Sequence, residues 1–111
     1  MTTTTKELFG RLTCADVEAW VTHSPGGLNI TPHEIPVCAG FDITIHLAPE
    51  VEIGNAKTRP KSGTTADWLK KENEAPDKIV IKVPRGLDTK LYQFKITIKG
   101  VGTIDPGVRV V

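Results

Sequence analysis

Apolar and polar residues alternate in several short stretches of the chain. The clearest alternation lies in 41–47, where the apolar positions are Phe41, Ile43, Ile45 and Leu47. Successive side chains of a β-strand point to opposite faces, so this pattern predicts a strand with one buried face. The same reasoning predicts strands at 15–22, 79–83 and 91–99.

Prolines and glycines separate the remaining apolar residues into further strands. The stretch 28–38 contains Pro32, which favours an edge strand, a bulge or a crossing between sheets. Val51 and Ile53 mark a short strand, and 103–111 continues around a kink at 105–107. About seven short strands with turn signals between them predict one all-β domain over 1–111, with 1–12 as a peripheral N-terminal segment. The expected fold is a Greek-key β-sandwich, either immunoglobulin-like or cupredoxin-like.

The long polar stretch 54–78 interrupts this pattern. It shows no strand alternation, and we expect a loop in which 65–73 forms one or two helical turns, capped by a threonine or by Asp67. A loop of this length in a small domain is unusual and often functional.

Charge and termini narrow the function classes. The formal net charge of +1 gives no support for nucleic-acid or membrane binding. The charge is unevenly spread, because residues 1–53 carry two basic and seven acidic side chains and residues 54–111 carry twelve and six. The N-terminus shows no apolar signal region, so we expect a cytoplasmic protein.

Cys14 and Cys38 are the only cysteines. In a reducing cytosol we expect two partly buried thiols that pack as small hydrophobic groups. They lie near the ends of two predicted neighbouring strands, so a disulfide is the alternative.

Four segments resemble a known group of proteins. They are 79–84 (Ile-Val-Ile-Lys-Val-Pro), 92–98 and 102–110 with its Asp105-Pro106, together with 30–40. These patterns resemble a small bacterial family of cupredoxin-like sandwiches and cover about half of the chain. The resemblance implies the sandwich fold.

The copper site of cupredoxins is missing from the sequence. A blue-copper site needs two His, a Cys thiolate and usually a Met, with most of them near the last strands. No Cys, His or Met follows Pro84, and the copper-loop position holds 84–91 instead. The spacings of structural zinc sites, nucleophile elbows and phosphate-binding loops are also absent. We therefore expect no enzyme activity, no metal and no cofactor.

Five residues are candidates for an interaction surface: Lys57, Arg59, Lys61, Trp68 and Trp20. The three cations and nearby hydroxyls of the loop could bind an acidic partner. Tryptophan is a common interface anchor. The alternative is a solvated loop fixed to the sandwich by Trp68 and Leu69.

The outward faces of the strands suggest a second contrast. Strands 15–22 and 41–47 present Asp16, Glu18, Trp20, Asp42 and His46, whereas 79–83 and 91–99 present mainly lysines. If these pairs of strands belong to different sheets, one face is acidic and the other basic, which would favour a homo-oligomer or a docked partner. The alternative, which we favour, is ordinary solubilising charge.

These observations favour a non-catalytic protein-interaction or accessory domain that presents 54–78 to another protein. The alternative is a small-molecule or carbohydrate-binding module that uses Trp20, Trp68 or Tyr92 as stacking platforms. Copper electron transfer is disfavoured because the ligands are absent.

Overall fold

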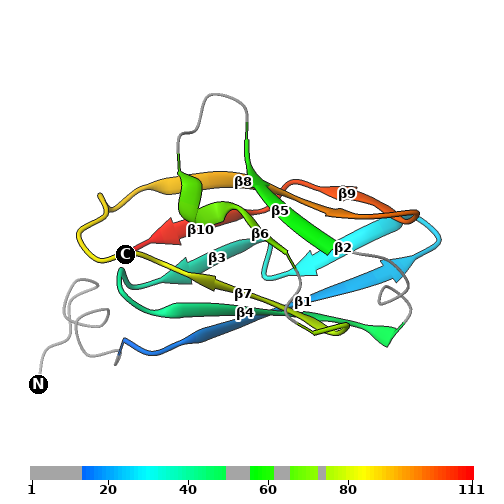
Figure 1. The fold of residues 1–111 in the computed structure, drawn as a ribbon, viewed down its shortest axis with the longest axis horizontal. Helices are drawn as coiled ribbons and strands as arrows, with labels where there is room; N and C mark the ends of the chain where they lie inside the picture. Colours follow the sequence, from blue (N-terminus) through cyan, green and yellow to red (C-terminus); the bar gives the residue numbers. More distant parts are fainter. Residues whose placement is uncertain (1–13, 50–55, 62–65, 73–74) are drawn as a thin grey trace, which may run out of the picture.

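Two β-sheets pack face to face to form the domain (Figure 1). The structure is a computed structural model that describes residues 14–49, 56–61, 66–72 and 75–111. The first sheet has the order β2 (Gly27–Thr31), β1 (Val17–Ser24), β4 (Asp42–Leu47), β7 (Lys78–Lys82). In it β1 runs parallel to β4, and the other neighbours are antiparallel. The predicted all-β sandwich is confirmed.

The second sheet is built around the long strand β8 (Leu91–Ile98). On one side β8 pairs with β5 (Ala56–Pro60), which in turn pairs with β6 (Lys71–Glu72). On its other side β8 pairs with β9 (Gly102–Ile104) and β10 (Gly107–Val110), and β3 (Glu34–Val37) pairs in parallel with β10.

The predicted alternation places the core between the sheets. In β1, β4, β7 and β8 every second side chain is buried and the intervening ones face outward. The fully buried large side chains are Phe94, Ile35, Ile43, Ile45, Leu69, Ile79, Ile81, Ile96, Ile98, Val21 and Val37. Removing this apolar area from water supplies the main driving force for folding.

Prolines lie at two of the breaks between strands. The chain passes from β2 in the first sheet to β3 in the second at the cis Thr31–Pro32 peptide bond, so the structure has the crossing between sheets that was one of the three alternatives for Pro32. The predicted kink at 105–107 separates β9 from β10, and the register with β8 continues across it from Gly102↔Ile98 to Arg109↔Leu91. Pro106 lacks an N–H, and its carbonyl accepts a hydrogen bond from the Phe94 N–H at 3.1 Å.

The prediction of a strandless loop over 54–78 was wrong. Residues 56–60 form β5, and its register with β8 runs from Ala56↔Ile98 to Pro60↔Phe94. The buried positions of β5 are Ala56 and Thr58, which do not read as an apolar strand face in the sequence. The expected strand around Val51 and Ile53 lies outside the described residues.

The expected helical turn is a single 3₁₀ turn, η2 (Asp67–Leu69). Its N-terminal capping position is Ala66, with no side-chain hydrogen bond, so the expected cap by a threonine or Asp67 was wrong. The turn is held instead by burial of Leu69. The predicted peripheral segment 1–12 lies outside the described residues.

The strand pairing differs from the expected one in one respect that changes the surface. β1 and β4 share a sheet, but β7 belongs to that sheet too and does not share a sheet with β8. Lys82 is therefore the cross-strand neighbour of Asp42, and Lys78 is the neighbour of His46. The outer face of the first sheet therefore carries both charge signs, and the condition for one acidic and one basic face is not met.

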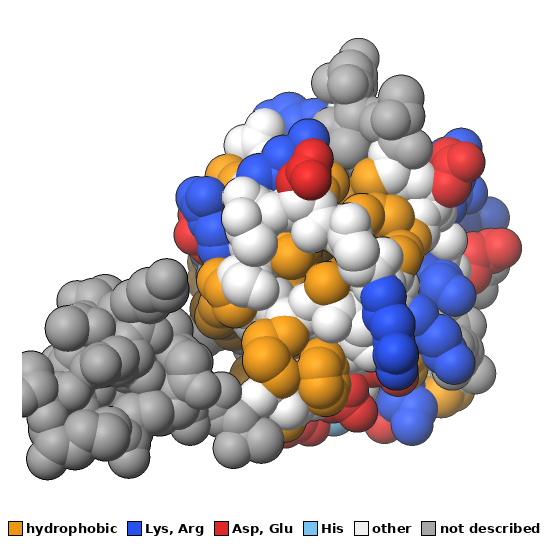
Figure 2. All heavy atoms as spheres, turned by 90° about the vertical axis from the view of Figure 1, so that its left-hand side faces the viewer, with side chains coloured by type: hydrophobic (Ala, Val, Ile, Leu, Met, Phe, Trp, Pro, Cys, Tyr) orange, Lys and Arg blue, Asp and Glu red, His pale blue; other side chains and the backbone are white. Residues whose placement is uncertain are grey.

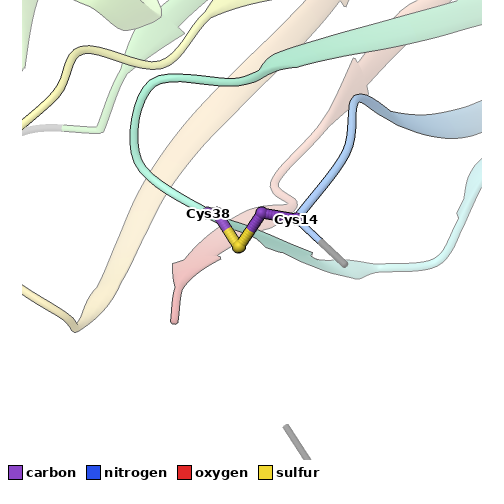
Figure 3. Close-up of a disulfide and its surroundings, with 2 residues drawn as sticks. All are labelled: Cys14 and Cys38. Carbon is purple, nitrogen blue, oxygen red and sulfur yellow. A yellow bond between two sulfur atoms is a disulfide. The ribbon is translucent and has the colours of Figure 1, made fainter. Parts of the chain in front are cut away.

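Cys14 and Cys38 form a disulfide, with Cα atoms 5.8 Å apart (Figure 3). The expectation of two thiols is corrected, because Cys14 precedes β1 and Cys38 follows β3, and both strand ends lie at one end of the sandwich. The disulfide thus connects a strand of the first sheet to a strand of the second.

Candidate interaction surfaces

A row of cations follows the outer face of β5. Lys57, Arg59 and Lys61 occupy alternate positions along the chain, and Ala56, before the first of them, and Thr58 face the core. The Lys61 N–H donates to the Gln93 carbonyl at 3.0 Å, which extends the pairing with β8 by one residue. The three expected cations therefore stand on a strand, at spacings of about 7 Å, and not on a loop.

Like charges face each other across β5 and β8. Arg59 is the cross-strand neighbour of Lys95, and Lys57 is the neighbour of Thr97. Both Arg59 and Lys95 are exposed, and neither forms an ion pair within the described part of the chain. Like charges directly opposite each other in a sheet destabilise it. We call Lys57, Arg59, Lys61 and Lys95 the basic strip.

A shallow hollow adjoins the basic strip. It is lined by Arg59, Lys70, Lys71 and Glu72. Lys70 is partly neutralised, because its Nζ lies 3.3 Å from Oδ1 of Asp67. Glu72 is the cross-strand neighbour of Lys57 and adds one carboxylate at the edge. Cations still outnumber carboxylates around the hollow.

Thr58 holds the segment beside the strip in place. Its hydroxyl donates to the Leu69 carbonyl and accepts from the Lys71 N–H at 3.0 Å. Thr58 is the only buried polar residue among those that the structure describes, and both hydrogen bonds satisfy it. The hydroxyl thus connects η2 and β6 to β5, and these three elements carry the residues that line the hollow or adjoin them.

Trp68 packs toward the interior. Its ring meets that of Tyr92 edge to face, with centroids 5.4 Å apart, and the residue is partly buried against the core. Tyr92 donates from its hydroxyl to the Asp88 carbonyl at 3.1 Å. This arrangement matches the alternative in which Trp68 and Leu69 fix the segment to the sandwich.

Trp20 lies on the outer face of the first sheet and is 49% exposed. Its ring stacks on His46, with an interplanar angle of 19° and centroids 5.5 Å apart. His46 Nε2 in turn lies 2.8 Å from Oε1 of Glu18. The exposed indole is held in one orientation by these two neighbours.

The aromatic residues do not form a common platform. Trp20 belongs to the first sheet, whereas Trp68 packs on Tyr92, whose strand belongs to the second. A carbohydrate platform would require these rings to line one surface.

The 84–90 turn and the C-terminus lie at one end of the sandwich (Figures 1 and 2). Hydrophobic and basic side chains are mixed there in Figure 2. The two cysteines are joined in the disulfide, and the described residues contain no cluster of three or more His, Cys, Asp or Glu side chains that could hold a metal.

Sequence reasoning missed Lys95 and Thr58 as parts of the site. Lys95 was placed among the outward lysines of 91–99, but its opposition to Arg59 depends on the unpredicted pairing of β5 with β8. The alternation of Lys57, Arg59 and Lys61 with small or uncharged residues was the available signal for a strand.

No protein-family model matches the chain, and no curated protein matches it in sequence. Within the described residues, no helix is long and apolar enough to cross a membrane.

Proposed function

We propose that this protein is a non-catalytic interaction domain that binds an acidic surface of another protein through the basic strip. The observation that carries the proposal is the opposition of Arg59 and Lys95 on β5 and β8. Two cations placed side by side, with no carboxylate partner among the residues that the structure describes, cost stability, and an anionic partner would remove that cost.

The geometry favours a protein partner with spaced carboxylates. The cations of β5 recur at about 7 Å, which is also the spacing of alternate side chains on an extended peptide. Arg59 offers a planar guanidinium that can bind a carboxylate through two parallel hydrogen bonds. The neighbouring Thr97 and Thr103 hydroxyls are hydrogen-bonded to each other at 3.2 Å, and the one that accepts this bond can donate its own proton to a partner.

A titration followed by nuclear magnetic resonance tests the proposal. The probe is a synthetic oligo-glutamate peptide added to the isotope-labelled chain, and the amides of β5 and β8 are expected to shift. Neutralising Lys57, Arg59 and Lys95 to Gln is expected to weaken binding by on the order of tenfold or more, since each exposed charge pair contributes up to about 1 kcal/mol.

The matched control neutralises Lys78 and Lys82 to Gln on the other sheet, and it should leave the affinity unchanged. Equal losses in the two variants would contradict the proposal, because they would show binding through overall charge. If heparin or DNA binds the basic strip more tightly than the peptide does, the ligand is a polyanion other than an acidic protein, and the proposal of a protein partner fails.

The disulfide favours an oxidising compartment over the cytoplasm expected from the sequence. Disulfides persist in secreted and periplasmic settings and are rare in the cytosol, where thiols are kept reduced. Treatment of intact cells with a thiol-trapping maleimide should leave both cysteines unlabelled. Labelling of both cysteines before any reduction would support the cytoplasmic expectation.

A further inference from the structure

The outer face of the first sheet separates its charges strand by strand. β1 presents Asp16 just before its start and Glu18 within it, whereas the edge strand β7 presents Lys78 and Lys82. All four side chains are exposed. The strand between them, β4, contributes Thr44 and His46 to the middle of the face, with Asp42 at one end.

The rows of this face follow from the strand registers. Trp20, His46 and Lys78 form one row across β1, β4 and β7, and Glu18, Thr44 and Val80 form the next. Asp16 comes beside Asp42, whose N–H donates to the Asp16 carboxylate at 2.8 Å. Asp42 in turn is the neighbour of Lys82. Asp16 and Glu18 thus lie two strand spacings, about 10 Å, from β7, whereas Asp42 lies one strand spacing from Lys82.

We infer that this face binds the same face of a second copy of the chain, about a two-fold axis that runs along β4. Rotation about that axis places β1 of one copy over β7 of the other. Asp16 then meets the second copy's Lys82, and Trp20 meets its Lys78. Each contact occurs twice, as a two-fold interface requires.

Charge complementarity selects a second copy as the occupant. The axis along β4 also brings the two copies of Asp42 together, but each has Lys82 as its cross-strand neighbour. A two-fold axis perpendicular to the strands would place β1 over β1 and bring the two copies of Glu18 together in a row without a lysine, so the axis along β4 is the more favourable of the two. The exposed indole of Trp20 supplies the aromatic anchor that such interfaces commonly have at their centre. Its contact with a lysine ammonium adds a cation–π attraction.

The size of the face sets the strength of the dimer. Three strands, β1, β4 and β7, overlap in this arrangement and cover a flat area of roughly 300 Å² on each copy, which is well below the ~800 Å² that each partner buries in a standard interface. The dimer is therefore weak, and added salt weakens it further.

Sedimentation velocity of the full chain over a range from about 10 µM to 1 mM tests the inference. The wild type is expected to form a dimer. In each of the double variants Lys78→Glu/Lys82→Glu and Asp16→Lys/Glu18→Lys, the dissociation constant of the dimer should rise tenfold or more. Because one variant then has an acidic face and the other a basic one, an equimolar mixture of the two should form a heterodimer.

Several results would overturn the inference. The first is a wild type that stays monomeric over the whole concentration range. The second is a dimer that persists in the Lys78→Glu/Lys82→Glu variant. The third is failure of the two oppositely charged variants to form a heterodimer when both are folded. The Lys57→Gln/Arg59→Gln change on the opposite sheet serves as control and should leave dimerisation unchanged. That control also separates this inference from the proposed function. It changes only cations of the basic strip, so it should weaken binding of the acidic peptide and leave the dimer intact. If Asp16→Lys/Glu18→Lys does not fold, a mixture of wild type with Lys78→Glu/Lys82→Glu still tests the inference. At the same total protein concentration, the mixture should contain a smaller fraction of dimer than wild type alone.

Discussion

The hydroxyl of Thr58 on β5 donates a hydrogen bond to the carbonyl of Leu69, at the end of the 3₁₀ turn. The same oxygen accepts from the Lys71 N–H, so one side chain replaces the backbone pairing that the turn interrupts. This relationship makes 66–72 part of the sandwich and fixes the cations beside β5.

Thr58→Val is expected to lower the free energy of unfolding by about 2 kcal/mol. Valine keeps the shape of threonine but leaves a buried carbonyl and a partly buried N–H without their partner. Urea denaturation measures the change, and hydrogen exchange should show lost protection at Lys71. The control, Thr97→Val, removes an exposed hydroxyl pair and should change stability by less than about 0.5 kcal/mol. Equal effects of the two substitutions would show that the Thr58 hydroxyl has no special role.

Leu69→Ala is expected to cost about 2–5 kcal/mol, as for other fully buried leucines. A solvated loop would tolerate the change. Asp67→Ala, which removes only the exposed ion pair with Lys70, is the matched control in the same turn. A thermal or urea midpoint for Leu69→Ala equal to that of Asp67→Ala would contradict the packing described for η2.

Replacing both Cys14 and Cys38 by Ala is expected to reduce stability by about 3 kcal/mol. The disulfide closes a chain segment with a sequence separation of 24, and opening it raises the entropy of the unfolded chain. Urea denaturation of the double variant measures the loss. Reducing agent should destabilise the wild type and leave the variant unchanged, and a response of the variant to reductant would point to a different cause.

Gly40→Ala is expected to destabilise the protein by about 1–2 kcal/mol. Gly40 has φ of 91°, a conformation that side-chain-bearing residues avoid, and a Cβ there would lie 3.0 Å from Cγ of Arg85. A second substitution, Arg85→Ala, removes the crowding but not the backbone cost. If the Gly40→Ala/Arg85→Ala variant recovers full stability, crowding and not backbone conformation is the cause.

The sequence predicted the parts of the fold that depend on local alternation. The buried positions of 41–47 and 91–98 follow directly from their apolar spacing, and Pro32 marked the crossing between sheets. β5 escaped prediction because its buried face consists of Ala56 and Thr58, whose burial depends on hydrogen bonds formed across the fold.

Long-range pairing explains the remaining differences. Alternation tells which side chains of 79–83 are buried but not which sheet the strand joins, so the position of Lys82 beside Asp42 could not be predicted. The disulfide likewise depends on the approach of two chain segments at one end of the sandwich. Of the candidate site, the cations of β5 were identified from sequence, and their opposition to Lys95 was not.

The disulfide also determines how the domain carries a mechanical load. Tension that arrives along the chain before Cys14 passes through the sulfur atoms to Cys38 and reaches β4 without crossing the segment between them. β1, β2 and β3 lie within that bypassed segment. When the domain is pulled from its two ends, unfolding should release roughly 80 Å less chain than the sequence length allows, at about 3.5 Å for each bypassed residue. The oxidised domain is therefore shorter when stretched than the reduced one.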